Sequence, residues 1–188
     1  MTKPNIGNGT ILPYDGRYPK IASTAYICRG AYVIGDVEIG DYTVVHPGTV
    51  LRGDGGKLII GKWSLFQDNV VVHCNWHGID VVIEDHFNAS LGAIVHAFGI
   101  GEGSFIGAAA VVANGVYLGK RCFVAAGAVV PQDLKAPSNS ILIGVPARIK
   151  ENDDAERLLS RFGDTLAITP QQKEFRLKQL EVYRREGH

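Results

Sequence analysis

Apolar residues recur every six positions along most of the chain. The series consists of Ile27, Val33, Ile39, Val45 and Leu51, then Ile60, Phe66 and Val72, then Ile83, Ala89 and Val95, then Ile100, Ile106, Val112, Leu118, Val124 and Val130. An α-helix needs a period of about 3.6 and a half-buried strand a period of about 2, so neither explains this spacing. Short strands with a turn every six residues do explain it.

The six-residue period predicts a parallel β-helix, in which each hexad forms one side of a triangular coil and three hexads complete a turn. Aliphatic side chains fill the interior, and small residues two positions earlier, such as Thr43 and Ser64, fit at the corners. We expect the left-handed form. The two interruptions, residues 53–57 and 75–81, are expected to be loops at corners. The predicted class is therefore all-β, a left-handed parallel β-helix over residues 1–150.

The sequence leaves the repeat after Val130 and later changes to helix signals. A first helix is predicted to begin at a cap provided by Asn152 or Asp153, and Gly163 is predicted to end it. We therefore expect C-terminal α-helices after the β-helix.

A second C-terminal helix has a stronger signature. Thr169, Pro170 and Gln172 form a capping-box pattern with proline at the first helical position, and the helix is predicted to run to about Arg185. Residues 151–188 are thus expected to be a helical appendage. The second helix either packs across the outside of a β-helix, its own or a neighbour's, or is a solvated tail.

Composition excludes several classes of function. The 188 residues suffice for one domain with a short appendage, and 19 basic residues balance 19 acidic ones, so a nucleic-acid or membrane-surface partner is not expected. No apolar stretch is long enough to span a membrane, and the N-terminus has no signal-peptide core, which predicts a cytoplasmic protein. The 23 glycines, about twice the usual share of roughly 7%, indicate many tight turns.

The coil register predicts a column of polar side chains. Residues three hexads apart lie one strand spacing apart, about 4.8 Å, and the residues that follow three aligned apolar positions are Arg52, His73 and His96. They point outward because the preceding residues point inward. Two imidazoles at this spacing can share a metal ion. The alternative is that they are polar residues stacked at a subunit contact.

A second group of polar residues lies one side of the coil away. Asp68 is expected one rung below Leu91, next to Gln67. Packing flat faces of three β-helices around a threefold axis hides strand backbones and creates three equivalent clefts, so we expect a homotrimer. Arg52, Asp54, Gln67 and Asp68 form a charged and amide set near such a cleft. Alternatively, Arg52 and Asp68 form a structural salt bridge across the trimer contact.

Four motifs carry a resemblance to a known family. The order LRGDGGKLIIG, FQDNVVVH, ASLGAIVHAFGIGEGSFIG and IGVPARIK resembles the gamma-class carbonic anhydrases and their hexapeptide-repeat relatives, over about residues 11–149. The resemblance implies a trimeric left-handed β-helix with a metal, usually zinc, at the subunit interface. It implies that His73 and His96 are metal ligands from one subunit. A third histidine is expected from the adjacent subunit, at the position of Leu91.

The same resemblance assigns roles to the charged set. Arg52 and Asp54 would hold the interface, and Gln67 and Asp68 would line the site as catalytic residues. The implied cofactor is Zn²⁺ or another divalent metal, which lowers the pKa of its bound water so that hydroxide attacks an electrophilic carbon of a small-molecule substrate.

Two leucines depart from the family pattern. Leu91 replaces the third histidine ligand, and Leu65 replaces an asparagine two residues before the glutamine. A catalytic zinc normally keeps three protein ligands, so the site needs a substitute. The candidates are His77 in the second interruption and Cys74 directly before it, and His86 is a more distant one.

Three hypotheses therefore remain open. The first is a metal-dependent hydratase or hydrolase of the gamma carbonic anhydrase type, acting on carbon dioxide or on a bond such as a thioester. The second is a metal-free member whose trimer is a binding or assembly module, which Leu91 and Leu65 favour. The third is a hexapeptide-repeat acyltransferase with a histidine as general base, against which stands the absence of a long coil region after Val130.

Overall fold

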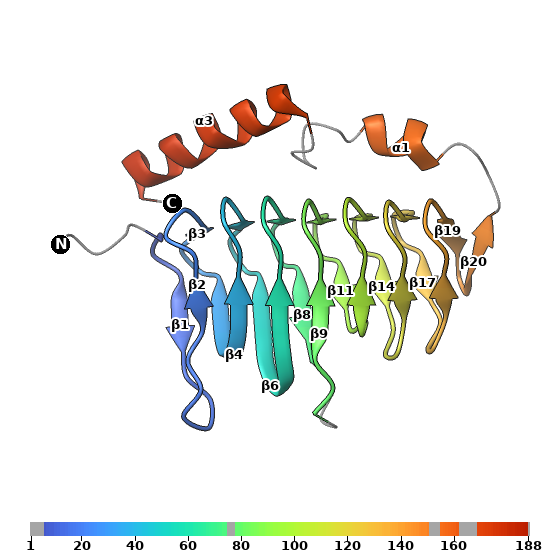
Figure 1. Ribbon diagram of the computed structural model, residues 1–188, viewed down its shortest axis with the longest axis horizontal. Coiled ribbons are helices and arrows are strands. Elements are labelled where there is room, and N and C mark those ends of the chain that lie inside the picture. Colours follow the sequence, from blue (N-terminus) through green and yellow to red (C-terminus); the bar gives the residue numbers. More distant parts are fainter. Residues whose placement is uncertain (1–5, 75–77, 151–154, 162–168, 188) are drawn as a thin grey trace.

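A computed structural model describes residues 6–74, 78–150, 155–161 and 169–187 and consists of a parallel β-helix with two helices along one side (Figure 1). Among the described residues, the strand pairs of the coil are parallel and the final hairpin is antiparallel, as is an isolated bridge between Tyr14 and Arg17. The expectation of an all-β, left-handed parallel β-helix of hexapeptide repeats with C-terminal α-helices is confirmed.

The strands form three faces, which we call A, B and C. Face A consists of β3 (Tyr26–Ile27), β5 (Val44–Val45), β7 (Leu65–Phe66), β10 (Asn88–Ala89), β13 (Phe105–Ile106), β16 (Phe123–Val124), β19 (Ile141–Gly144) and β20 (Ala147–Lys150). Face B consists of β1 (Thr10–Leu12), the first halves of β4 (Tyr32–Ile39) and β6 (Val50–Ile60), β8 (Val71–His73), β11 (Ile94–Val95), β14 (Val111–Val112) and β17 (Val129–Val130). Face C consists of β2 (Lys20–Ile21), the second halves of β4 and β6, β9 (Val81–Ile83), β12 (Gly99–Ile100), β15 (Tyr117–Leu118) and β18 (Lys135–Ala136).

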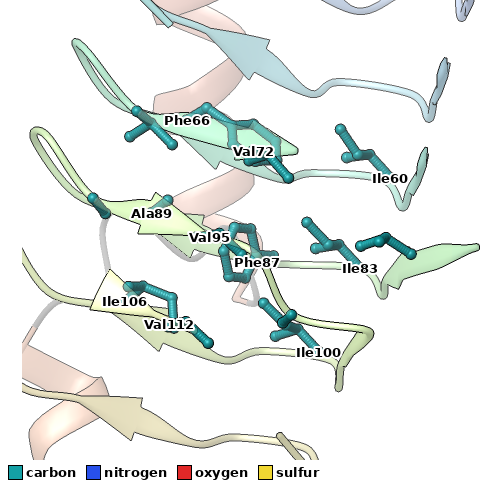
Figure 2. Packing of buried hydrophobic residues seen from close by; sticks show 14 of the residues in the cluster. Ile60, Phe66, Val72, Ile83, Phe87, Ala89, Val95, Ile100, Ile106 and Val112 are labelled. Atoms are coloured by element: carbon teal, nitrogen blue, oxygen red, sulfur yellow. The ribbon is translucent and has the colours of Figure 1, made fainter. Parts of the chain in front are cut away.

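The interior is built from columns of apolar side chains that repeat with the coil. Figure 2 shows three of them, and the strand register aligns their members as Ile60 with Ile83 and Ile100, Phe66 with Ala89 and Ile106, and Val72 with Val95 and Val112. These side chains are buried in one continuous cluster. The hexad pattern thus encodes the core directly, because each apolar position stacks on its equivalent in the next coil.

Corners between faces require a left-handed backbone. At the corner between faces A and B, Asn69 has φ +60° and Gly92 has φ +68°, and these residues follow the aligned positions Asp68 and Leu91. Glycine adopts this region without a Cβ penalty, and asparagine tolerates it. The high glycine content therefore reflects the corners of the coil.

One boundary prediction holds in part and another was wrong. Residues 53–57 do form an insertion at the corner between faces B and C, since Gly53 pairs with Gly35 and Leu58 with Val37, but they are part of strand β6 and not a loop. The coil also does not end at Val130, since Ala136 pairs with Leu118 and Leu142 pairs with Val124 in the same register. The six-residue step continues through Ala136 and Leu142, although the residues between them are mostly polar.

The two helices cover face A. Helix α1 (Ala155–Arg161) places Leu159 on a cluster with Phe105, Phe123 and Ile141. The expected caps of this helix at residues 152, 153 and 163 lie outside the described residues.

Helix α3 (Pro170–Glu186) covers the first coils of face A. Thr169 and Gln172 form the predicted capping box, and the helix ends with Gly187 at φ +73°. Leu180 is fully buried against Tyr26 and Leu65 of the same chain, so the alternative of a solvated tail is wrong. In the part of the chain that the structure describes, neither helix is long and apolar enough to cross a membrane.

Candidate functional site

The predicted polar column on face B is present. Arg52 pairs in register with His73, and Val72 with Val95, which places His96 directly after the next member of the column. One Nη atom of Arg52 lies 3.0 Å from Nε2 of His73. Strand β6 therefore supplies the guanidinium, and the ends of β8 and β11 supply the imidazoles.

Asp54 joins this column from the stretch that we had expected to be a loop. Its carboxylate is almost fully buried, with 5% of the side chain exposed, and it lies 3.1 Å from Nε of Arg52. The other carboxylate oxygen lies 2.8 Å from Nε2 of His73. The shorter contact to the carboxylate favours a proton on Nε2, which donates to Asp54; the guanidinium of Arg52, which can only donate, then touches Nε2 without a hydrogen bond. We assign this tautomer from the hydrogen-bond network.

The two imidazoles form a stacked pair. Their ring centroids are 5.2 Å apart with an angle of 21° between the planes, and Nδ1 of His73 lies 3.2 Å from Nε2 of His96. With the His73 proton on Nε2, its Nδ1 accepts a hydrogen bond from His96. The proton of His96 then sits on Nε2, and its Nδ1 carries a lone pair. The three side chains Asp54, His73 and His96 thus form one directed hydrogen-bond chain.

The environment keeps His96 neutral. Burial lowers the pKa of His96 below its ordinary 6.5, and the neighbouring His73 lowers it further. A neutral imidazole can accept a proton at neutral pH or bind a metal. His96 can therefore serve either as a general base or as a metal ligand.

Neither described candidate for the third metal ligand, Cys74 or His86, joins the column. Leu91 is 52% exposed and carries no donor atom. Cys74 points into the core, where burial raises the pKa of its thiol to about 12, so the expectation that this thiol serves as a substitute ligand is not met. His86 lies on the corner between faces C and A. His77 lies outside the described residues.

The described residues therefore do not fit a complete zinc site. His73 and His96 supply two nitrogens, but Asp54 engages Nε2 of His73, and no group of three histidine, cysteine or acidic side chains able to hold a metal occurs within residues 6–74, 78–150, 155–161 and 169–187. A catalytic zinc normally has three protein ligands.

Gln67 and Asp68 form a separate cluster on face A. The hydroxyl of Ser90 donates to Oε1 of Gln67 at 3.2 Å, and Oδ2 of Asp68 lies 3.4 Å from Nδ1 of His46. In this chain Arg52 pairs with Asp54, while Asp68 faces His46. A single chain therefore does not bring all four predicted catalytic residues together.

Two residues of the face A cluster escaped the sequence analysis. His46 follows β5 on face A, and the hydroxyl of Tyr183 on α3 lies 3.2 Å from Nε2 of His46. His46 falls one position after the apolar member of its hexad, as His73 and His96 do, so the same register rule could have singled it out. No pattern in the sequence relates Tyr183 to it.

The fold and the column together define a hexapeptide-repeat β-helix protein with a candidate acid–base site on its surface. The family model described as "Bacterial transferase hexapeptide (six repeats)" matches residues 18–53 and 99–132. Among curated proteins, the "Probable carbonic anhydrase" of Methanocaldococcus jannaschii is 38% identical over 140 residues, covering 74% of this chain and 87% of that protein. The "Carnitine operon protein CaiE" of Proteus sp. is 33% identical over 139 residues, covering 74% of this chain and 70% of that protein. The chain therefore belongs to the gamma carbonic anhydrase-like family of hexapeptide-repeat proteins.

Solved structures agree with this fold. A hexapeptide transferase family protein from Anaplasma phagocytophilum superposes with a TM-score of 0.78 and 27% sequence identity, covering 93% of this chain and 98% of that one. The fold is thus shared along nearly the whole length of both chains.

Proposed function

We propose that this protein adds water to an electrophilic carbon of a small molecule, as a hydratase of carbon dioxide or a hydrolase of a bond such as a thioester. The observation that carries the proposal is the directed chain from Asp54 through His73 to His96. A buried carboxylate that orients an imidazole is a common arrangement for proton transfer in enzymes. The similarity to a protein named as a carbonic anhydrase supports the same class of reaction.

The side chains of the column have distinct roles in this reaction. His96 accepts a proton from water while the water oxygen bonds to the electrophilic carbon. His73 and Asp54 hold His96 in the tautomer that can accept it. Arg52 neutralises the Asp54 carboxylate and presents its remaining N–H groups to an anionic product such as bicarbonate. With a thioester, the leaving thiolate takes the proton from His96.

We propose that the complete site forms at the interface of a homotrimer. Gln67 and Asp68 lie on face A and the histidines on face B, so a neighbouring protomer could bring the two sets together. The exposed β-branched side chains of Val71 and Ile94 on face B support burial of this face. We expect this trimer to act in the cytoplasm without nucleic-acid or membrane partners.

The metal-dependent form of this proposal requires one more donor. His73 and His96 would hold Zn²⁺, or another divalent metal, only together with a third ligand, and His77 is the remaining candidate. Zinc would supply a bound water of lowered pKa. Because the described residues do not complete such a site, the proton steps above are assigned to side chains alone.

The test is to assay the purified protein for carbon dioxide hydration and thioester hydrolysis, before and after chelation and with added zinc. Activity is expected to be lost in His96→Ala, while the oligomeric state and the thermal transition stay unchanged because the side chain points away from the core. Glu84→Gln on face C is the matched control and keeps full activity. An inactive protein with and without zinc, or a monomer in solution, contradicts the proposal.

A metal-free binding or assembly module is the second candidate. The exposed apolar side chain of Leu91 favours it, because this residue stands where the family carries a ligand. A stable trimer without activity or bound zinc supports this alternative. The third hypothesis, acyl transfer from acetyl-coenzyme A, is tested by assaying the same purified protein for that reaction.

A further inference from the structure

Three polar side chains connect α3 with face A through one hydrogen bond and one longer contact to a carboxylate. The Tyr183 hydroxyl lies 3.2 Å from Nε2 of His46, and Nδ1 of His46 lies 3.4 Å from Oδ2 of Asp68. The side-chain amide of Gln179 donates to the Tyr183 oxygen at 2.9 Å. Because this oxygen already accepts from Gln179, its own hydrogen can point to Nε2 of His46. The proton of neutral His46 then lies on Nδ1, facing the carboxylate.

Packing holds the Tyr183 ring in this position. It stacks on Tyr26 with ring centroids 5.7 Å apart, and it meets the ring of His46 edge-on at the same distance. The adjacent turn of α3 is anchored by Leu180, which is fully buried. The hydroxyl and the imidazole therefore stay within proton-transfer distance, on elements fixed by the core.

His46 is equipped to accept a proton. Its side chain is 14% exposed, and burial lowers its pKa, although the nearby Asp68 carboxylate raises it and the Arg176 guanidinium lowers it further. The imidazole is thus neutral at neutral pH. Asp68 is 45% exposed, and Tyr183 is half-buried, so the group lies at the surface of the protein.

We propose that Tyr183, His46 and Asp68 form a second catalytic site, in which the tyrosine hydroxyl is acylated by activated esters or thioesters. A nucleophile bonded to a base that is oriented by a third group is the general arrangement for nucleophilic catalysis. The nucleophile and base lie on α3 and face A, whereas the column of Arg52, His73 and His96 lies on face B. Asp68 is shared with the proposed trimer site, but the acylation uses residues of one chain alone, so this inference does not rest on the proposed function.

Tyr183 and His46 account for every bond and proton transfer of the proposed reaction. The Tyr183 oxygen bonds to the acyl carbon, and its proton passes to Nε2 of His46. The bond from the acyl carbon to the leaving oxygen or sulfur breaks, and the leaving group takes that proton. Water then attacks the acyl-tyrosine with His46 as base, which returns the free phenol and releases the carboxylic acid. Asp68 stabilises the imidazolium that forms in each half-reaction.

The experiment uses the full chain and p-nitrophenyl acetate. We expect a burst of nitrophenolate and an acetyl group on Tyr183 by peptide mass spectrometry. Tyr183→Phe removes both, and its ring keeps the stacking with Tyr26. His46→Ala slows acetylation on the order of 100-fold, the usual scale of a general base, and added imidazole restores part of the rate. Chemical rescue distinguishes a base from a purely structural residue.

Two control variants make the outcome decisive. Tyr117→Phe removes an exposed tyrosine of face C and leaves the burst unchanged. His73→Ala abolishes the proposed water-addition activity but not the acetylation, so failure of one proposal is distinguishable from failure of the other. Amide hydrogen exchange of α3 is followed in each variant. If α3 opens in His46→Ala, Asp68→Asn replaces it and is expected to slow acetylation in the same way.

The inference is overturned by acetyl groups spread evenly over exposed tyrosines such as Tyr18. It is also overturned by acetylation of Tyr183 at the wild-type rate in a folded His46→Ala or Asp68→Asn variant. Either result means that the phenol reacts without help from the imidazole.

Discussion

The imidazole of His73 stacks on the imidazole of His96, and Nε2 of His96 donates a hydrogen bond to Nδ1 of His73 at 3.2 Å. The two residues occupy the same position on successive rungs of face B. Their contact is thus a direct product of the coil spacing, which places equivalent residues about 4.8 Å apart along the β-helix axis.

Leu91→His is expected to create a zinc site. In a trimer this residue would restore the third nitrogen donor, and binding of at least one zinc per chain, more than tenfold tighter than in the natural protein, should follow. Elemental analysis and competition with a chelator measure it. The control is Leu12→His, which changes an exposed leucine on β1 and is expected to gain no zinc binding. Equal zinc binding in both variants would show that the threefold arrangement is wrong.

Asp54→Ala is expected to destabilise the fold by about 1–3 kcal/mol, because it leaves the polar groups of Arg52 and His73 near a buried site without their acceptor. Urea unfolding measures the change. Glu181→Ala, an exposed acidic residue on α3, is the comparison and should lie within about 0.5 kcal/mol of the natural protein. If the two variants are equally stable, the Asp54 contacts contribute nothing.

Gly35→Ala and Gly127→Ala are expected to lower the free energy of unfolding by different amounts, although both glycines have positive φ. At Gly35 (φ +80°) an added Cβ clashes with the backbone carbonyl of Gly53, so we expect a loss of roughly 3 kcal/mol. At Gly127 (φ +67°) the Cβ meets nothing within 4 Å, and backbone strain alone costs about 1 kcal/mol. Thermal unfolding of both variants checks this order, and the reverse order would contradict the corner geometry.

Acidification is expected to loosen α3 through His46. The pKa of His46 is lowered from its ordinary 6.5 by burial, so the unfolded chain binds this proton at a higher pH than the folded one. Its contribution to stability is therefore complete above about pH 6.5 and is lost as the pH falls through the lowered value. Protonated Nε2 can no longer accept from Tyr183.

Hydrogen exchange of α3 near neutral pH and at about pH 5 measures this effect. His46→Gln keeps a polar side chain of similar length but does not titrate, and its α3 should respond less to acid. If acid changes the hydrogen exchange of α3 equally in the natural protein and in His46→Gln, the effect comes from titratable groups other than His46.

Much of the candidate site could be predicted because it follows from periodicity. Once the inward positions are known, counting residues places Arg52, His73 and His96 on one outer column, and the register of the strands bears this out. The same counting located the insertion at residues 53–57 but not its strand conformation, because an insertion has no periodic constraint and its conformation depends on the neighbouring coil. The partners of Asp54 were therefore not foreseeable.

The sequence by itself determined the β-helix, its register and the capping box of α3, because these depend on local spacing and on short-range hydrogen bonds. Only the tertiary structure decided that Cys74 faces the core, that Asp54 orients His73, and that Tyr183 reaches His46 from 137 positions along the chain. The last contact depends on where α3 packs on face A, and apolar burial is non-directional, so no local pattern specifies that position.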